Sequence, residues 1–517
     1  MAAQTNPADW IDDAARTYPQ RVFLKTPEGR QYNYESLRSE TARFGAALER
    51  RGVVPGDRVA AQVEKSVEAV LLYLACLRLG AVFVPINDAN TPNEVDYFLR
   101  DSQPRVAVVR PSQHAALALV AERAGVAHFE TLGRDGETSL LGAGAPGDSS
   151  FESSPHMDAN ALAAIVYTSG TTGRSKGAML TRRNLASNAA ALVEAWHFSS
   201  SDVLLHALPL FHIHGLFAAI NTVLASGSSL LLLPRFDSEL VLRHMPEVTV
   251  FMGVPTHYTR LLQHAGLNRE ATSRMRLFVS GSAPLLAETH AEFRQRTGHA
   301  ILERYGMTET LINTSNLYEG PRIPGAVGKA LPGVAIRLAE RESAGLDAAT
   351  EAPGPGLGVG AVEVAGPNVF AGYWRDPEKT RAEFAADGWF KTGDLGQIDG
   401  EGYLHIVGRA KDLVISGGYN VYPKEVEVEL DALNGVLESA VFGVPHPDFG
   451  EGVTAAVVGA PEAGLSESAI IRAVQARLAR YKVPKRVLIL DELPRNAMGK
   501  VQKNALRATY ARLYDDG

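Results

Sequence analysis

The sequence predicts an α/β protein with two stacked α/β subdomains, a smaller β-rich, barrel-like subdomain and a small α+β C-terminal domain. The chain has 517 residues, and because single hydrophobic cores stop growing at about 250–300 residues, more than one domain is expected. Short apolar runs alternate with amphipathic helical windows in the N-terminal part, which is typical of β-α-β units and parallel sheets. Further along, short strands separated by glycine and proline replace this alternation.

The alternation is clearest between residues 59 and 109. Runs of branched and small apolar residues at 59–63, 81–86 and 106–109 predict strands, and the windows at 66–79 and 94–101 predict helices. The same pattern resumes later, with strand-like runs at residues 163–167, 228–233, 248–251, 275–279 and 300–302. Each run is short enough to be a central strand covered on both faces.

Two regions follow that differ from this pattern. Between residues 325 and 408 the strands are short, and Asp399-Gly400 lies between two of them as a predicted hairpin turn. The rest of the chain, with a helix predicted at 466–481, is typical of a small α+β domain. We therefore expect a large N-terminal domain over residues 1–410 and a small C-terminal domain over residues 411–517. Low-complexity sequence at 142–154 and 344–360 predicts a surface connector and a variable loop.

Composition excludes several classes of protein. The net charge is −7, with 45% hydrophobic and 21% charged residues, so there is no general attraction to nucleic acid or acidic membranes. The single cysteine, Cys76, lies in an apolar run, which excludes a disulfide framework and fits a reducing cytosol. No apolar run reaches about 18 residues, and no basic segment followed by a hydrophobic one opens the chain. We expect a cytoplasmic protein with no membrane or nucleic-acid partner.

Residues 167–177, Tyr-Thr-Ser-Gly-Thr-Thr-Gly-Arg-Ser-Lys-Gly, are the most informative segment. Glycines allow the backbone to approach a ligand, hydroxyl and N–H groups donate to phosphate oxygens, and Arg174 and Lys176 offset negative charge. ATP is the predicted ligand. The segment is not a Walker loop, because Lys176 is followed by glycine and alanine instead of serine or threonine. A surface turn before a helix that begins near Thr181 is the alternative.

Three further segments carry polar residues suited to nucleotide chemistry. Glu309, in the segment 303–310, could hold the Mg²⁺ that accompanies ATP, and Tyr305 could stack on a purine. Asp394 could accept both ribose hydroxyls, and Arg409 could reach phosphate or ribose oxygens. Lys500, near the C-terminus, could stabilise charge moving between a carboxylate and a phosphoryl oxygen. Taken singly, each has a simpler explanation as a helix cap, a turn or a solvated lysine.

In this order the segments resemble the adenylate-forming superfamily, which includes acyl-CoA synthetases, adenylation domains and firefly luciferase. The resemblance extends from about residue 31 to residue 503 and rests on the combination of motifs at 167–177, 305–309, 392–394, 408–412 and 499–500. It implies that an acid, ATP and CoA react through an acyl-adenylate and pyrophosphate to give an acyl-CoA and AMP. Mg²⁺ with ATP, and CoA as co-substrate, are implied with it.

The resemblance also implies roles for residues. The expected ATP-binding residues are Thr168, Ser169, Gly170, Thr171, Thr172, Gly173, Lys176, Tyr305, Gly306, Thr308, Asp394, Arg409 and Lys500. The expected catalytic residues are Lys500, His212, Thr168, Lys176 and Glu309, with Glu309 also the metal ligand. In the family the small domain is mobile and swings about the position of Lys411, presenting Lys500 first and then Ser416, Gly417 and Gly418 beside the pantetheine thiol.

The choice of acid depends on the acyl pocket, for which we expect His212, Arg235, Arg276, Ser282 and Met307. Arg276 interrupts an apolar strand, so we predict that it binds a second carboxylate through a two-pronged pair. An exposed position at the start of the strand is the alternative, and Arg235 is a second candidate for this role. The segments 206–217, 253–262, 303–310 and 419–427 resemble malonyl-CoA synthetases, which makes malonate the leading substrate. Methylmalonate is expected to be tolerated, because one methyl group discriminates by only about 1–3 kcal/mol.

Other activities stay open at this point. A ligase for another short-chain or methyl-branched mono- or dicarboxylic acid, or a stand-alone adenylation enzyme that loads a carrier protein, would share the first half-reaction. Only seventeen residues follow Lys500, too few for a fused carrier domain. A luciferase-type monooxygenase or a silent binding protein fits the set of polar residues less well. We expect a monomer or a weak homodimer.

Overall fold

The computed structural model describes residues 6–142, 151, 157–168, 175–339, 358–496 and 499–514. The chain divides into two compact units. The first comprises Met1–Ala335 and Val364–Phe390, and the second comprises Ile336–Glu363 and Lys391–Gly517. The chain passes between them within three strands, β16 (Ala335–Ala339), β17 (Gly360–Ala365) and β19 (Phe390–Ile398). A domain boundary at residue 410 stays a prediction.

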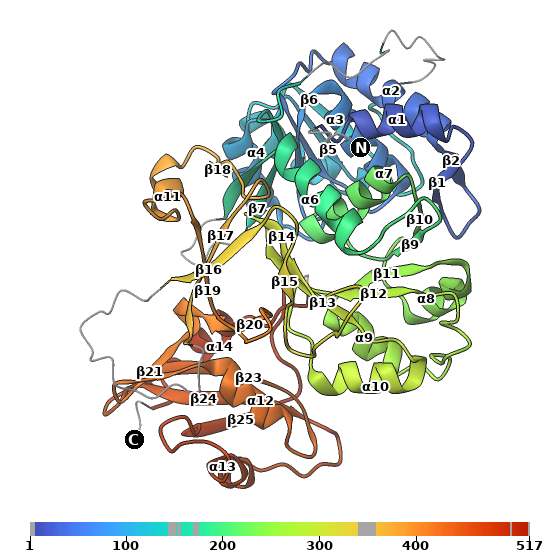
Figure 1. Ribbon diagram of the computed structural model, residues 1–517. Coiled ribbons are helices and arrows are strands. Elements are labelled where there is room, and N and C mark those ends of the chain that lie inside the picture. The colour runs from blue at the N-terminus through green and yellow to red at the C-terminus, as the bar shows by residue number, and fades with distance from the viewer. Residues whose placement is uncertain are drawn as a thin grey trace. The chain divides into compact units, whose positions relative to one another are not determined.

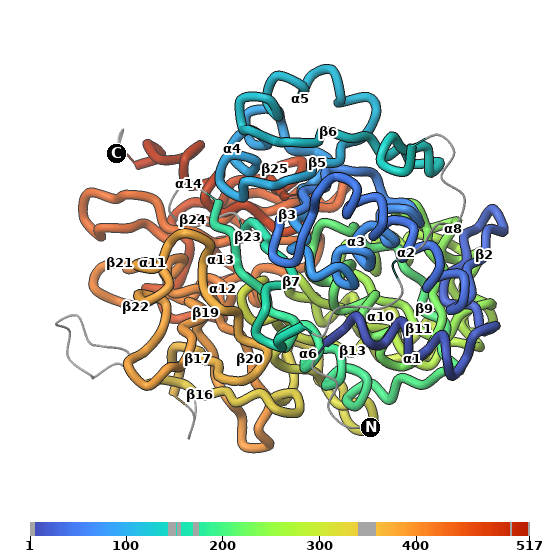
Figure 2. The backbone as a smooth tube through the Cα atoms, turned by 90° about the horizontal axis from the view of Figure 1, so that it is seen from above, coloured from blue at the N-terminus to red at the C-terminus, as the bar shows by residue number. Residues whose placement is uncertain are grey.

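The first unit contains a seven-stranded sheet in which the predicted β-α-β pattern is confirmed. Its order is β18 (Gly372–Tyr373), β8 (Lys176–Thr181), β7 (Leu162–Thr168), β4 (Val82–Pro85), β3 (Arg58–Gln62), β5 (Val106–Val109) and β6 (His128–Thr131). Strands β7, β4, β3, β5 and β6 run parallel, whereas β8 pairs antiparallel with both β7 and β18. Helices α4 (Pro92–Ser102) and α5 (Pro111–Arg123) lie beside β5 and β6 (Figure 2).

Helix α3 (Val67–Leu79) shows how the sequence sets the ends of an element. The Ser66 side chain accepts a hydrogen bond from the Ala69 N–H at the start, and Gly80 ends the helix in the left-handed region with φ of 83°. Every residue of α3 is buried, which explains its continuous apolar sequence. The Tyr73 ring of α3 contacts both Phe83 of β4 and Phe217 of the π-helix η1 (His214–Asn221), which belongs to the second layer of this unit. The helix therefore packs between the two stacked layers.

The second layer of this unit is a nine-stranded sheet. Its order is β15 (Lys329–Ala330), β14 (Leu311–Ser315), β13 (Leu302–Met307), β12 (Leu277–Ser280), β11 (Val250–Gly253), β9 (Val203–His206), β10 (Ser229–Leu232), β1 (Val22–Lys25) and β2 (Gln31–Asn33). The strands from β13 to β1 are parallel. Because β10 and β11 lie on opposite sides of β9, the strand order reverses there, and open α/β sheets bind ligands at the carboxyl ends of strands beside such a point.

Helices surround both sheets of the first unit. In Figure 1, α9 (Pro255–Leu262) and α10 (Ala287–Thr297) lie against β11 and β12. The remaining helices are α1 (Asp9–Thr17), α2 (Tyr34–Arg50), α6 (Arg182–Ala195), the π-helix η1 (His214–Asn221), α7 (Thr222–Ser226), α8 (Ser238–His244), the 3₁₀ turn η2 (Met245–Glu247) and α11 (Pro377–Ala382). None of the helices in the described part of the chain combines the length and apolar character needed to cross a bilayer.

The second unit has two sheets. One contains β16, β17, β19 and β20 (Leu404–Arg409), and the predicted turn at Asp399 between β19 and β20 is confirmed. The other contains β22 (Tyr419–Val421), β21 (Val414–Ser416), β24 (Gly450–Gly459), β23 (Val436–His446) and β25 (Arg486–Leu490). The helical segments are η3 (Ala410–Asp412), α12 (Pro423–Asp431), α13 (Glu467–Gln475) and α14 (Lys503–Thr509). The mixed α/β architecture, with a large N-terminal and a small C-terminal part, confirms the predicted fold class.

Alternating residues of β23 and β24 separate two small cores. Val441, Val453 and Val457 pack with α12 and α13, whereas Phe442 and Ala456 pack with α14 on the opposite face. The α+β prediction for this part is therefore confirmed. Helix α13 ends six residues earlier than expected, and Tyr481, instead of continuing the helix, stacks on Tyr419 with 4.7 Å between ring centroids.

Candidate active site

The predicted phosphate-binding segment connects two antiparallel strands of the seven-stranded sheet. Thr168, the last residue of β7, lies opposite Lys176, the first residue of β8. Strand β8 then leads into α6, whose first turn is capped by the Thr181 side chain, so the helix begins where the sequence predicted. The predicted phosphate ligands between these strands lie outside the described residues; they are Ser169, Gly170, Thr171, Thr172 and Gly173.

Lys176 and Glu309 come together through a tyrosine that the sequence analysis missed. The Lys176 Nζ lies 5.5 Å from the centroid of the Tyr373 ring, and the Tyr373 hydroxyl donates to Glu309 Oε1 over 3.1 Å. Tyr373 reaches this place because β18 pairs with β8, nearly 200 residues away in sequence. Burial lowers the pKa of Lys176, and Lys379 adds to the effect; burial and Glu309 raise the pKa of Tyr373. No local signal distinguishes Tyr373 from the other fifteen tyrosines.

Glu309 is suited to holding a magnesium ion that is shared with phosphates. Its side chain is buried, at 6% exposure, in the turn between β13 and β14, beyond the carboxyl end of a strand of the nine-stranded sheet. Among the described residues no group of three or more His, Cys, Asp or Glu side chains gathers as a metal cage. Mg²⁺ in nucleotide sites uses one or two carboxylates plus phosphate oxygens and water, so a single carboxylate meets the need.

The other residues of this motif lie on β13 and in the turn that follows it. Tyr305, Gly306 and Met307 are half-buried strand residues, and Thr308 begins the turn. A side chain at Gly306 is impossible, because a Cβ there would lie 1.9 Å from the backbone oxygen of Leu311 on the paired strand. The close approach explains why the motif needs glycine at this position.

His212 and Ser282, both expected in the acyl pocket, come together through His214. The His214 N–H donates to His212 Nδ1 over 3.2 Å, and the Ser282 hydroxyl lies 3.4 Å from His214 Nδ1. Ser282 has a φ of 73°, in the left-handed region. A non-glycine residue adopts this conformation at a cost in free energy, and such residues are frequent at functional sites. His214 begins the π-helix η1 and is fully buried, and burial lowers its pKa well below the ordinary value.

The structure corrects the prediction for Arg276. Its Nε and Nη2 donate to the two carboxylate oxygens of Asp202 over 2.6 and 2.7 Å, and its Nη1 donates to the Trp196 carbonyl. Arg276 precedes β12 and Asp202 precedes β9, so both lie at the amino ends of their strands, whereas ligands bind at the carboxyl ends. This placement argues against Arg276 as the group that holds a second carboxylate. The alternative is right about the position at the start of the strand, but Arg276 is half-buried and ion-paired instead of exposed.

The hydrogen bonds between Arg276 and Asp202 favour the charged form of both side chains. Burial alone would raise the pKa of Asp202, but hydrogen bonds from Arg276, the Ser199 N–H and Thr249 outweigh burial and lower it. Burial likewise opposes the charge of Arg276, and Asp202 outweighs burial and raises its pKa. By contrast, Arg235 follows β10 at its carboxyl end and is exposed, and its role as a substrate ligand stays a prediction.

The second unit brings together the other predicted nucleotide ligands. Asp394 on β19 lies opposite Arg409 on β20, with 2.7 Å between Arg409 Nε and Asp394 Oδ1. Lys500 is an exposed residue in the field of the same groups: desolvation of its ammonium group, Arg409 and Lys411 lower its pKa, whereas Asp394 and Asp412 oppose that shift. Residues more than 100 positions apart thus share one electrostatic environment.

The segment expected beside the pantetheine thiol is a tight hairpin of the same unit. Ser416 ends β21 and pairs with Tyr419, so Gly417 and Gly418 form the two-residue turn, with φ of 59° and 82°. A type I′ hairpin requires positive φ at both central residues, and glycine adopts these values without strain. Lys411, the expected hinge, is exposed and lies in η3.

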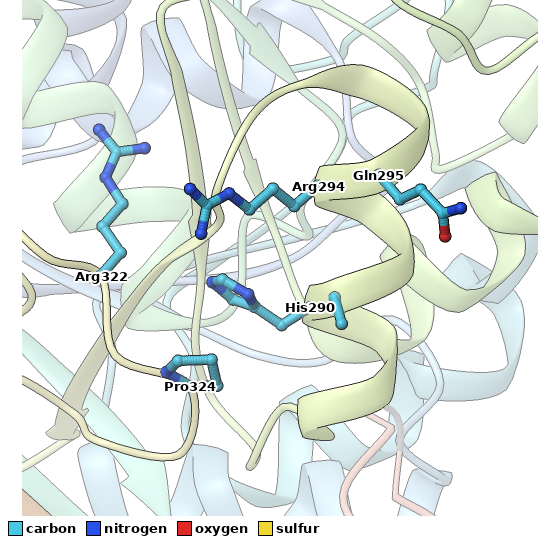
Figure 3. Close-up of a pocket in the computed structure, with 6 residues that line it drawn as sticks. His290, Arg294, Gln295, Arg322 and Pro324 are labelled. Atoms are coloured by element: carbon cyan, nitrogen blue, oxygen red, sulfur yellow. The ribbon is translucent and has the colours of Figure 1, made fainter.

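A hollow on the surface of the first unit lies outside this set of residues (Figure 3). It has a volume of about 460 Å³ and is lined by His290, Ala291, Arg294, Gln295, Arg322 and Pro324. Two of its polar side chains already bond to the backbone: His290 Nε2 to Ile301 O, and Arg322 to Ala300 O. None of the predicted site residues lines it.

Family models identify the class of protein that this fold and these motifs define. The model of AMP-binding enzymes matches residues 11–374, and the model of the C-terminal domain of AMP-binding enzymes matches residues 425–500. The chain therefore belongs to the AMP-binding enzyme family, and the resemblance to adenylate-forming enzymes is confirmed.

Individual relatives narrow this class. The chain is 52% identical to MatB from Rhodopseudomonas palustris, solved with ATP bound; the match covers 98% of this chain and 99% of that one, with a TM-score of 0.91. It is 36% identical to the mitochondrial malonate–CoA ligase ACSF3 of Mus musculus, over 88% of this chain and 82% of the relative. It is 35% identical to a feruloyl-CoA synthase of an Amycolatopsis species, over 97% and 98% of the two chains.

Proposed function

We propose that the protein is an ATP-dependent malonate–CoA ligase, which converts malonate, ATP and CoA to malonyl-CoA, AMP and pyrophosphate. The observation that carries this proposal is similarity along nearly the whole chain, both to ATP-bound MatB and to malonate–CoA ligases. In the first half-reaction a malonate oxygen attacks the α-phosphorus, and the bond to the β-phosphate oxygen breaks. In the second, the CoA sulfur attacks the acyl carbon, AMP leaves, and the thiol proton passes to solvent.

The first unit supplies groups for the triphosphate. Lys176 offsets the charge of the leaving phosphates, and the Thr168 hydroxyl donates to a phosphate oxygen. Glu309 would hold Mg²⁺, which neutralises phosphate charge when bound, and Thr308 would bind a phosphate oxygen. The hydrogen bond from Tyr373 orients the Glu309 carboxylate, and the pairing of β18 with β8 keeps Lys176 beside it.

The second unit supplies groups for the nucleoside and the reacting centre. Asp394 accepts hydrogen bonds from the ribose hydroxyls, and Arg409, held by Asp394 at 2.7 Å, donates to phosphate or ribose oxygens. Lys500 stabilises the charge that moves from malonate to the α-phosphoryl oxygens. Gly417 and Gly418 leave room for the pantetheine arm in the thioester-forming step. His212 of the first unit serves the same step, near the acyl carbon.

A comparison of acids tests the proposal. We expect CoA-dependent release of AMP and pyrophosphate to be fastest with malonate, slower with methylmalonate, and weak with succinate, acetate and octanoate. The measurement is kcat/KM for each acid at saturating MgATP and CoA, with detection of the acyl-adenylate by mass spectrometry. A strong preference for octanoate would contradict the malonate assignment and leave the AMP-forming chemistry intact. The cytoplasmic location and the monomeric or weakly dimeric state stay predictions.

A further inference from the structure

The surface hollow of Figure 3 concentrates positive charge on the first unit. It lies between α10 and the loop that joins β14 to β15, and its volume is about 460 Å³. In Figure 3, His290 and Arg294 point from α10 toward Arg322 and Pro324 of that loop, whereas Gln295 points away. His290 and Arg294 are four residues apart, which places them on the same face of the helix. Two guanidinium groups and one imidazole therefore face a single recess.

Protein carboxylates do not balance this charge. Among the residues that the structure describes, neither Arg294 nor Arg322 forms an ion pair with an aspartate or a glutamate. The acidic residues of α10, Glu288 and Glu292, are offset by two positions and therefore face away, and Glu292 pairs with Arg296. Burial lowers the pKa of Arg322, and the side chains that shift it further are two tyrosines and another arginine. Like charges that share a recess repel each other, and an anion between them would remove that repulsion.

Arg322 is held in place by the backbone around it. Its Nη1 donates to the Ala300 carbonyl over 2.7 Å, and its Nη2 donates to the Tyr318 carbonyl over 3.3 Å. The guanidinium carbon also lies 5.8 Å from the centroid of the Tyr318 ring. These two bonds use one N–H group at each terminal nitrogen, so further N–H groups remain for a ligand. Because the side chain is already ordered, binding costs it little conformational entropy.

His290 is the third polar group of the hollow. Its Nε2 lies 3.0 Å from the Ile301 carbonyl, so Nε2 carries a hydrogen and Nδ1 is the nitrogen left for a ligand. Burial lowers the pKa of His290; the bond to Ile301 opposes this shift, and Arg294 and Arg322 add to it. Both arginines therefore lie within electrostatic reach of the imidazole. An anion that offsets them would favour a protonated His290, which donates through Nδ1 as well.

The chemistry and the position of the hollow point to a phosphate group bound away from the nucleotide. Planar guanidinium groups match phosphate oxygens, and a phosphate has enough acceptor oxygens for two arginines and a histidine. The volume is within the range of small-molecule sites and leaves room for the rest of a phosphorylated ligand. Ala300 and Ile301, which bond to Arg322 and His290, precede β13 at its amino end, whereas Glu309 follows the carboxyl end of that strand.

We propose that this hollow is a second anion site, in which Arg294, Arg322 and His290 bind the phosphate group of a small molecule. The site is separate from the nucleotide motifs, and its assignment does not depend on malonate as the substrate. Inorganic phosphate and a phosphomonoester share the chemistry that the hollow recognises. Because a ligand that binds only the folded protein stabilises it, occupancy raises the melting temperature.

Titration calorimetry on the full chain tests the proposal. The nucleotide site is first saturated with the magnesium complex of α,β-methylene-ATP, and inorganic phosphate or ribose 5-phosphate is then added. We expect one further site for at least one of the two, and none for ribose, which lacks the phosphate. Tighter binding of ribose 5-phosphate would identify a phosphomonoester as the ligand, and tighter binding of inorganic phosphate would identify the free ion. No binding of either compound to the saturated protein overturns the proposal.

Substitutions at Ala291, an exposed residue of α10 that lines the hollow, locate the site. Ala291→Glu adds a carboxylate there and should raise the Kd at least about tenfold, whereas the uncharged Ala291→Gln should change it by less than about threefold. Both residues are good helix formers, so folding is preserved. Arg294→Met should weaken binding at least about fivefold. Arg243→Met, in the last turn of α8 and paired with Glu239, is its matched control and should leave the Kd unchanged. An equal Kd for Ala291→Glu and wild type would place the anion elsewhere and overturn the assignment. Malonate-dependent ATP–pyrophosphate exchange should stay at the wild-type rate in all these variants.

Discussion

Two arginines of the first unit, Arg276 and Arg304, show how the surroundings of a residue decide its role. Arg276 precedes the apolar strand β12, whereas Arg304 lies within β13 and is only 4% exposed. The fold gives Arg276 a protein carboxylate at the amino edge of the sheet, whereas Arg304 Nε and Nη2, near the carboxyl edge, have no hydrogen-bond partner among the described residues. Since Asp202 and Arg276 are 74 residues apart, no local pattern reveals their pairing.

Replacing Arg276 with alanine should therefore affect stability and not substrate binding. The change leaves Asp202, 3% exposed, without its counterion, and we expect the free energy of unfolding to fall by about 2–3 kcal/mol. The KM for malonate should stay within about twofold. Urea unfolding and exchange kinetics measure the two quantities.

The double variant Arg276→Ala/Asp202→Ala provides the control. Because it leaves no charge unpaired, its loss of stability should be smaller than the sum of the two single losses. If the malonate KM of Arg276→Ala rises more than tenfold while its stability is unchanged, Arg276 binds the second carboxylate of the substrate, as the sequence predicted.

At the scale of single elements, the sequence predicts correctly the features that are set by residues close together in the chain. Strand β5 coincides with the predicted run 106–109, and α3 begins after Ser66 and ends before Gly80, because side-chain period and caps act within a few residues. Helix α13 was predicted too long, since its apolar spacing continues past Gln475 while Tyr481 contacts a ring some 60 residues away.

Helix α12 carries a carboxyl group that makes stability depend on pH. Burial raises the pKa of Asp431, the last residue of α12, to about 6, although a hydrogen bond from Ser439 acts in the opposite direction. The C-terminal end of a helix also disfavours negative charge. Between the unfolded pKa near 3.8 and the folded value near 6, the folded state holds a proton that the unfolded state lacks. The stabilisation is therefore complete below pH 3.8 and is lost as the pH rises through 6.

Asp431→Asn should remove this dependence. The amide oxygen still accepts from Ser439, and no charge is buried at high pH. We expect the gain in unfolding free energy over wild type to be about 2 kcal/mol larger at pH 8 than at pH 4.5. Urea midpoints at the two pH values measure the difference, and an equal gain at both would show that Asp431 has an ordinary pKa. Ser439→Ala, which removes the bond that lowers the Asp431 pKa, should enlarge the cost of the charge at pH 8.

At the scale of the whole molecule, the predicted nucleotide ligands are divided between two compact units. Lys176 and Glu309 belong to the first, and Asp394, Arg409 and Lys500 belong to the second. Adenylation needs neutralisation of charge at phosphate, whereas thioester formation needs access of a thiol to a carbonyl. If Lys500 acts only in the first step, a substitution of Lys500 impairs adenylation and leaves thioester formation intact.

We expect Lys500→Ala to reduce malonate-dependent ATP–pyrophosphate exchange by about 10²–10³-fold, the size of effect seen when one stabilising donor is removed. Thioester formation from supplied malonyl-adenylate and CoA should stay within a fewfold of wild type. The two half-reactions are assayed separately on the same preparation. Lys503→Ala is the matched control, because Lys503 pairs with Glu427 and should leave both steps unchanged. Equal loss of both half-reactions in Lys500→Ala would contradict the assignment.

The sequence by itself determined the α/β class, half of the strands and a few of the helices of the two layers, the family and the nucleotide motifs. These depend on period, spacing and short-range order, which the chain carries locally. Only the tertiary structure decided that Tyr373 joins Lys176 to Glu309 and that Asp202 pairs with Arg276. The partner of a buried charge is set by whichever strands pair and pack around it, and those strands come from distant parts of the chain.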